Sequence, residues 1–76
     1  MSYKIGEVVK LRGSFDYNNK IGTIIKIDED YPYAGNKVQR LLVQGKDLGG
    51  AVEVIDGVRT FIKDSRYAYD FMVERV

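Results

Sequence analysis

The residues of this chain best suited to chemistry are aromatic and basic, and the chemistry they support is binding. Phe15 and Tyr17 fall in a polar stretch near the amino end, and Tyr31 and Tyr33 flank the single proline. Exposed aromatic rings can stack on bases, hold a proline-rich peptide or enclose a cation. The alternative is that two of these rings cover the open end of a small core, because aromatics carry much of such a core.

Several basic side chains form the second candidate group. Lys10 and Arg12 lie two positions apart, so they share one face of a strand, and Lys26 extends that face if the first two strands pair. Such a stripe would meet phosphates or acidic partner groups; the alternative is an ordinary solvated sheet face. The predicted partner-binding residues are therefore Lys10, Arg12, Phe15, Tyr17, Lys20, Lys26, Tyr31 and Tyr33.

The charge balance favours a protein partner over nucleic acid. Twelve Lys and Arg residues stand against eleven Asp and Glu, whereas nucleic-acid-binding domains usually have a higher pI. The basic excess is local, since residues 1–27 hold five basic and two acidic side chains before the acidic run 28–30. That run lacks the ligand spacing of a calcium loop.

Residue types that are missing exclude several kinds of active site. The chain has no cysteine and no histidine, which excludes disulfides, thiolate or imidazole zinc sites, and Ser-His or Cys-His nucleophilic pairs. The glycine-rich segment 45–50 lacks the order of a phosphate-binding loop, and nothing pairs two carboxylates in a cleft. We therefore expect no enzymatic activity, no catalytic residue, no metal and no cofactor.

The apolar runs indicate neither a leader nor a membrane segment. They are a few residues long, against about twenty for a membrane helix, and the first residues do not resemble a signal peptide. We expect a cytoplasmic protein with no membrane insertion.

The elements that must position these residues are expected to be strands. Val, Ile, Tyr and Phe occur in short runs at 7–12, 21–28 and 38–44, separated by Gly, Asn and Asp, as is typical of short strands. A long loop is expected over 28–37, with a turn at Gly35-Asn36.

A hairpin is expected over residues 51–62. Asp56-Gly57 separates two β-forming runs, and an Asp-Gly pair suits a type I′ turn because both central positions need a positive φ.

The carboxyl end has two interpretations. A helix capped by Asp64 or Ser65 would place Tyr67, Phe71 and Met72 on one side. We favour a tight turn through 65–69 followed by a closing strand 71–76, because a small sheet needs its edge covered. The predicted fold is one all-β domain over 1–76, a small SH3-like barrel of five or six short antiparallel strands with a short turn before the last strand.

Two stretches of the sequence resemble known families. Val-Val-Lys-Leu-Arg at 8–12, followed after a loop by 20–28 with Gly22, resembles the start of SH3-like barrels, including KOW-type nucleic-acid modules. Residues 14–18 and 21–24 are similar to the amino-terminal part of the small SH3-like subunit of photosystem I, and 67–73 is similar to the ending of that family.

The resemblance implies a noncatalytic role. By analogy with the photosystem I family, Lys10, Arg12 and Lys20 would help dock an acidic electron carrier. A KOW-like module would instead place Arg12, Lys20 and Lys26 on phosphates, with Tyr17 or Tyr31 stacking on bases.

Three functional hypotheses follow from the sequence. The leading one is a noncatalytic module that docks another protein, most simply as an accessory subunit of a larger assembly. The second is a KOW-like nucleic-acid-binding module. The third is a small oligomer with a ligand site at its symmetry axis.

Overall fold

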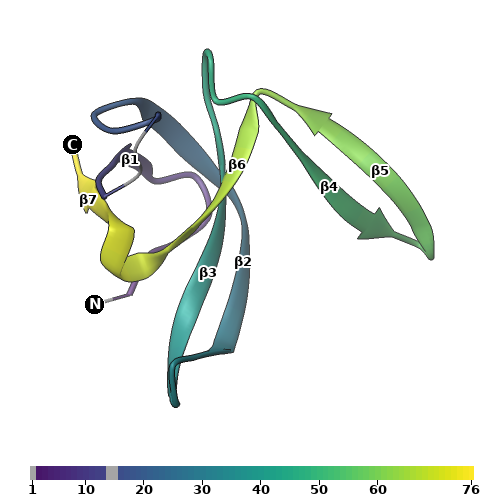
Figure 1. Ribbon diagram of the computed structural model, residues 1–76, viewed down its shortest axis with the longest axis horizontal. Helices are drawn as coiled ribbons and strands as arrows, with labels where there is room; N and C mark the ends of the chain where they lie inside the picture. Colours follow the sequence, from purple (N-terminus) through teal and green to yellow (C-terminus); the bar gives the residue numbers. More distant parts are fainter. Residues whose placement is uncertain (1, 14–15) are drawn as a thin grey trace.

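β-Branched and aromatic runs fold here as seven strands, so the all-β prediction is confirmed. The computed structural model describes residues 2–13 and 16–76, and the predicted site residue Phe15 lies outside them. Within this part of the chain the elements are β1 (Val8–Leu11), β2 (Ile21–Tyr33), β3 (Asn36–Gln44), β4 (Gly50–Ile55), β5 (Val58–Lys63), β6 (Ser65–Tyr69), the 3-10 turn η1 (Asp70–Met72) and β7 (Val73–Arg75) (Figure 1).

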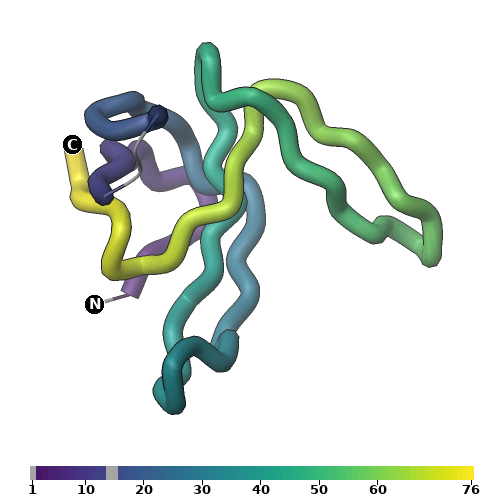
Figure 2. The backbone as a smooth tube through the Cα atoms, viewed as in Figure 1, coloured from purple at the N-terminus to yellow at the C-terminus, as the bar shows by residue number. Residues whose placement is uncertain are grey.

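Five of the strands form a curled antiparallel sheet of order β6-β3-β2-β1-β7. Only η1 separates the two edge strands in the chain. A flat five-stranded sheet would hold its edges about 19 Å apart, whereas the chain from Tyr69 to Val73 spans at most about 14 Å. The sheet must therefore bend back on itself at this end, as the path of the backbone shows (Figure 2).

The core fills the inner face of the curled sheet. Alternation along β3 sends Leu41 and Val43 inward, and they pack with residues of β1, β2, β6 and β7. The buried cluster consists of Tyr3, Val9, Leu11, Ile24, Leu41, Val43, Leu48, Ala68 and Val73.

The hairpin β4–β5 is inserted between β3 and β6 and projects away from the five-stranded sheet (Figure 1). Its turn is the predicted one, because Asp56 and Gly57 have φ values of 51° and 79°. At its base the backbone of Asp64 accepts a hydrogen bond from Gly45 N and donates one to Gly49 O, each at 2.8 Å.

The long loop expected over 28–37 is wrong, because β2 continues to Tyr33 and meets β3 at a two-residue turn. Ala34 and Gly35 form that turn with φ values of 49° and 81°. The acidic run is accommodated by a bulge between Asp28 and Tyr31, with Asp30 at φ 51°. A bulge lets the ladder resume after unpaired residues.

The carboxyl end closes with a strand, as favoured, but the tight turn is not at 65–69. Those residues form β6, which pairs with β3 from Gln44↔Ser65 to Arg40↔Tyr69. The turn is η1, and β7 then pairs with β1. The strand that was not predicted is β6, which brings the total to seven instead of five or six. It begins directly after Asp64, where a φ of 55° lets the chain change direction between β5 and β6.

Candidate functional site

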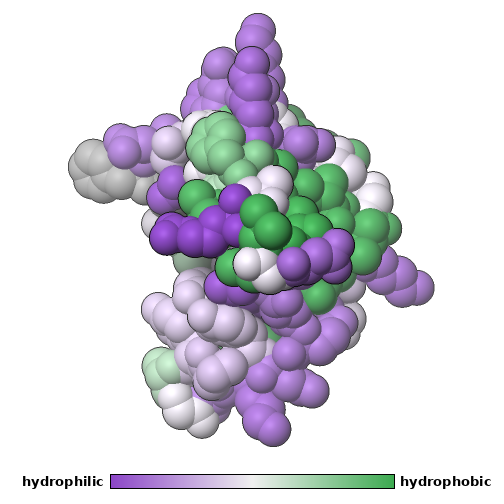
Figure 3. Space-filling model, turned by 90° about the vertical axis from the view of Figure 1, so that its right-hand side faces the viewer, coloured by the Kyte–Doolittle hydropathy of each residue, from purple (hydrophilic) through white to green (hydrophobic). Residues whose placement is uncertain are grey.

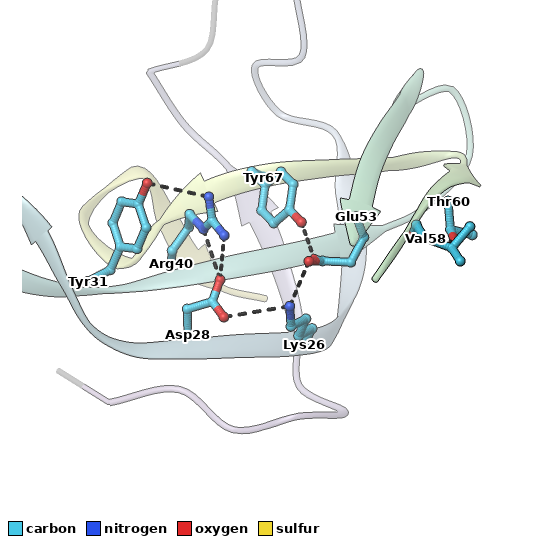
Figure 4. Close-up of polar contacts among 8 residues, drawn as sticks. All are labelled: Lys26, Asp28, Tyr31, Arg40, Glu53, Val58, Thr60 and Tyr67. Atoms are coloured by element: carbon cyan, nitrogen blue, oxygen red, sulfur yellow. Dashed lines mark hydrogen bonds and ion pairs between the residues drawn. The ribbon is translucent and has the colours of Figure 1, made fainter. Parts of the chain in front are cut away.

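An arginine held between two tyrosine rings dominates the outer face of the sheet. Arg40 on β3 donates from Nε and Nη2 to Asp28 Oδ2 at 2.9 and 2.7 Å. Its guanidinium carbon lies 4.4 Å from the ring centroid of Tyr31 and 4.3 Å from that of Tyr67 (Figure 4). The two ring faces and the carboxylate together fix this cation.

The same network connects the sheet to the hairpin. Lys26 Nζ lies 2.9 Å from Glu53 Oε1 and 3.7 Å from Asp28 Oδ1. The Tyr67 hydroxyl donates to Glu53 Oε2 (Figure 4). Because Glu53 belongs to β4 and its two partners to β2 and β6, these contacts hold the base of the hairpin against the outer face of the sheet.

The contacts between Lys26, Glu53 and Tyr67 shift the pKa values of all three groups. Partial burial, together with the hydrogen bond to Glu53, raises the pKa of Tyr67 to about 12. The hydrogen bonds from Tyr67 and Lys26 lower the pKa of Glu53, and the bond to Glu53 raises the pKa of Lys26. The group is thus charged Lys26, charged Glu53 and neutral Tyr67 at neutral pH.

The network is balanced in charge. Its two cations, Lys26 and Arg40, face its two carboxylates, Asp28 and Glu53. Because these charges are satisfied by one another, the network is better suited to positioning the hairpin than to attracting a charged ligand.

The β4–β5 hairpin presents the largest group of exposed apolar side chains in the described chain. The register Val52↔Phe61 and Val54↔Arg59 places Val52, Val54 and Phe61 on the face turned away from Glu53. Near the tip, the Ile55↔Val58 pair lies on the other face. Exposed fractions of these five residues run from 47 % to 66 %. Apolar atoms accordingly gather over the hairpin in the view toward its projecting side (Figure 3).

Phe61 is the most exposed of these residues, and its ring packs over the backbone of the neighbouring strand. Its ring lies over Gly50 of the neighbouring strand, where a Cβ would fall 2.2 Å from the ring Cζ. A side chain at position 50 would therefore displace the ring. Phe61 therefore lies over the backbone of Gly50 and yet remains 66 % exposed, so most of its side chain faces solvent.

A second aromatic cluster lies where the β2–β3 hairpin meets η1. Tyr33 is 4.6 Å from Tyr69 and 5.1 Å from Phe71 between ring centroids, and Tyr31 is 5.9 Å from Tyr69. Tyr69 and Phe71 stack at 5.6 Å. These rings bury area against each other, so less of their surface is left for a partner than on the hairpin.

The predicted site residues are divided among three places. Lys26 and Tyr31 belong to the outer-face network, and Tyr33 belongs to the aromatic cluster. Tyr17 packs against the core, with Arg66 4.2 Å above its ring. Because Arg66 and Tyr67 are consecutive on β6 and point to opposite faces, Tyr17 and Tyr31 do not line a common groove.

The remaining predicted basic residues lie around β1. Lys10 is opposite Glu74 in the ladder, and Arg12 Nη1 bonds Asn19 Oδ1 at 2.9 Å and lies 3.5 Å from Glu74 Oε1. Lys20 closes the preceding loop by donating its backbone N–H to Tyr17 O at 3.1 Å. Lys26 is instead engaged with Glu53 on the outer face of the sheet.

The sequence analysis predicted the hairpin turn but did not include any residue of the hairpin among the candidate binding residues. The signal was present: Val52, Val54 and Phe61 fall on one face while Ile55 and Val58 fall on the other. A strand pair with one solvated face should alternate apolar and polar residues. Exposed apolar residues on both faces depart from this pattern and distinguish the hairpin from an ordinary solvated strand pair.

Comparisons with known proteins do not place the chain in a family. No family model matches it, and no curated protein or solved structure does so either. Residues 2–13 and 16–76 contain no helix that is long and apolar enough to cross a membrane. Across the described part of the chain, three or more potential carboxylate ligands do not gather into a metal site.

Proposed function

We propose that the chain is a noncatalytic protein-docking module, a cytoplasmic accessory subunit built on an SH3-like barrel, with the β4–β5 hairpin as its docking arm. The observation that carries this proposal is the exposure of Val52, Val54 and Phe61 on one face of the hairpin. The strand order and the 3-10 turn before the last strand support the barrel assignment. The absence of cysteine suits a reducing compartment.

The exposed area matches what a protein partner would cover. With the exposed fractions given above, the three residues on one face, Val52, Val54 and Phe61, offer on the order of 300 Å² of apolar surface. A standard interface buries about 800 Å² per partner, of which about 57 % is apolar. One face of the hairpin thus supplies more than half of the apolar part of a standard interface.

Nucleic acid is the less supported partner. Binding to phosphates needs several cations on one surface, whereas Lys26 and Arg40 are paired with carboxylates and Arg12 lies beside Glu74. Arg59 and Lys63 of β5 share a face, but two cations are few for a phosphate-binding surface. A docking arm with an apolar centre instead suits a protein surface.

Photo-cross-linking in the cells that express the chain tests the proposal. Benzoyl-phenylalanine replaces Val54 on the hairpin or, as the matched control, exposed Lys37 beside the β2–β3 turn. We expect one defined protein adduct from position 54 and none from position 37. A defined adduct from position 37 alone, or none from position 54, would contradict the proposal.

A further inference from the structure

The outer edge of the hairpin is an unpaired strand edge with a definite hydrogen-bonding pattern. β5 forms a ladder with β4 and with no other described strand, and it is the outer strand of the arm in Figure 1. Across a two-residue turn the flanking residues Ile55 and Val58 exchange hydrogen bonds. Pairs then alternate, so Thr60 bonds to β4 while Arg59 and Phe61 turn their N–H and C=O groups to the free edge.

The usable edge is short and ends at Lys63. The Lys63 carbonyl already accepts from Ser65 Oγ at 3.1 Å and from Gln44 Nε2 at 3.5 Å. No proline interrupts β5, and its register with β4 is continuous from Gly50↔Lys63 to Ile55↔Val58. An added strand of about five residues would therefore fit, a mode in which main-chain bonds give affinity and side chains give specificity.

Side chains along this edge specify the chemistry of the added strand. Arg59, Phe61 and Lys63 point to one face of β5, which gives the order cation, aromatic, cation. The Glu53 and Thr60 side chains lie on the other face, and no carboxylate of the hairpin strands shares the face of the two cations. Opposite charges directly across a ladder stabilise the pair, and like charges destabilise it.

We propose that the free edge of β5 binds an extended segment of a partner protein with the pattern acidic, any, apolar, any, acidic. The apolar residue lies across from Phe61, and the acidic residues lie across from Arg59 and Lys63. The two intervening side chains of the same segment lie on the opposite face, across from Thr60 and Ile62, so a single strand contacts both faces of the arm. This inference rests on the proposed docking function and names the partner chemistry of that same site.

A second copy of the chain fits this edge less well. Antiparallel self-pairing centred on Phe61 brings the two rings together but sets Arg59 against Lys63 at both ends. These cations thus discourage pairing of two hairpins while favouring an acidic strand, a combination that natural edge strands use against self-association.

Fluorescence anisotropy with the purified full chain tests the pairing. The probes are the labelled peptide Ser-Glu-Val-Ile-Thr-Glu-Ser and the same peptide with lysine in place of both glutamates. We expect the acidic peptide to bind at least about tenfold more tightly at low salt, since both charge pairs reverse sign. Equal binding of the two peptides would overturn the proposal.

Two variants of Arg59 separate the contribution of the backbone to peptide affinity from that of the side-chain charge. Arg59→Ala removes the cation but keeps the N–H, whereas Arg59→Pro removes both and leaves the ladder to β4 intact. We expect Arg59→Pro to bind the acidic peptide about tenfold more weakly than Arg59→Ala, because an edge hydrogen bond is lost. Equal affinities would show that the backbone edge is not used.

Amide hydrogen exchange of the wild-type chain keeps the test independent of how these variants fold. Saturating acidic peptide should slow exchange at Phe61 and leave Thr60 unchanged, since the Thr60 N–H already bonds β4. Unchanged exchange at Phe61 would overturn the pairing. If neither peptide binds while position 54 still cross-links to a partner protein, the edge pairing is wrong and the proposed docking function is retained. If the peptides do not bind and position 54 gives no cross-link, the proposed docking function is wrong as well.

Discussion

At the scale of single residues, Glu53 joins the arm to the body. It accepts from Tyr67 of β6 and lies 2.9 Å from Lys26 of β2. The hydrogen bonds lower its pKa. A carboxyl group with a lowered folded-state pKa adds stability above its unfolded pKa, about 4.3, and that stability is lost as the pH falls through the folded value.

Replacing Glu53 by Gln should therefore alter the acid dependence of stability. We expect Glu53→Gln to cost about 0.5–1 kcal/mol at pH 7, through loss of the ion pair with Lys26. The difference between wild type and variant should shrink as the pH falls from about 5 to 3. Urea denaturation followed by circular dichroism at several pH values measures this. A difference that stays constant over that range would show that the carboxylate charge does not contribute.

Gly22 shows a different constraint on a single residue, close packing near the start of β2. A Cβ at this position would lie 2.5 Å from Val43 Cγ1 and 2.8 Å from the Gln44 carbonyl oxygen. The backbone of β3 must move to accept it. A glycine here is needed because the space beside the strand is already occupied.

We expect Gly22→Ala to destabilise the fold by about 1–3 kcal/mol through overpacking. The matched control is Gly35→Asn, where nothing lies within 4 Å of the added Cβ and asparagine tolerates the φ of 81°. Its cost should stay below about 1 kcal/mol. Urea midpoints compare the two, and equal losses would rule out close packing as the reason for Gly22.

At the scale of elements, local turn chemistry was predictable and long-range pairing was not. The Asp56-Gly57 turn follows from two residues that tolerate positive φ. In contrast, β6 was predicted to be a turn, because its strand character comes from pairing with β3, more than twenty positions earlier. The outer-face network escaped prediction for the same reason: Lys26, Arg40 and Glu53 meet only once the register of three strands is set.

The turn itself provides a test at this scale. Gly57→Ala forces a Cβ into φ 79° and should weaken the hairpin by about 1–2 kcal/mol. Exchange of the Thr60 amide, bonded across the hairpin, should then be about tenfold faster or more. Asp56→Asn is the control, because asparagine also tolerates positive φ. Equal exchange rates in the two variants would contradict the positive-φ requirement at Gly57.

At the scale of the whole molecule, the core of the sheet and the β4–β5 arm are built differently. The buried cluster lies within the five-stranded sheet and its loops, and no residue of β4 or β5 belongs to it. The arm buries Ala51 but leaves five larger apolar side chains exposed, and it contributes an ion pair and a hydrogen bond at its base. The residues that form the core cluster are thus separate from those of the proposed docking surface.

Two phenylalanines give the most direct test of the docking arm. Phe61 on the hairpin and Phe71 in η1 are 66 % and 56 % exposed, so replacing either with serine should change stability by no more than about 0.5–1 kcal/mol. The measurement is the Kd of each variant for the partner identified by cross-linking. We predict a loss of about 30-fold or more for Phe61→Ser, as for an anchor residue, and less than about threefold for Phe71→Ser. The reverse order would contradict the account and place the contact at the aromatic cluster.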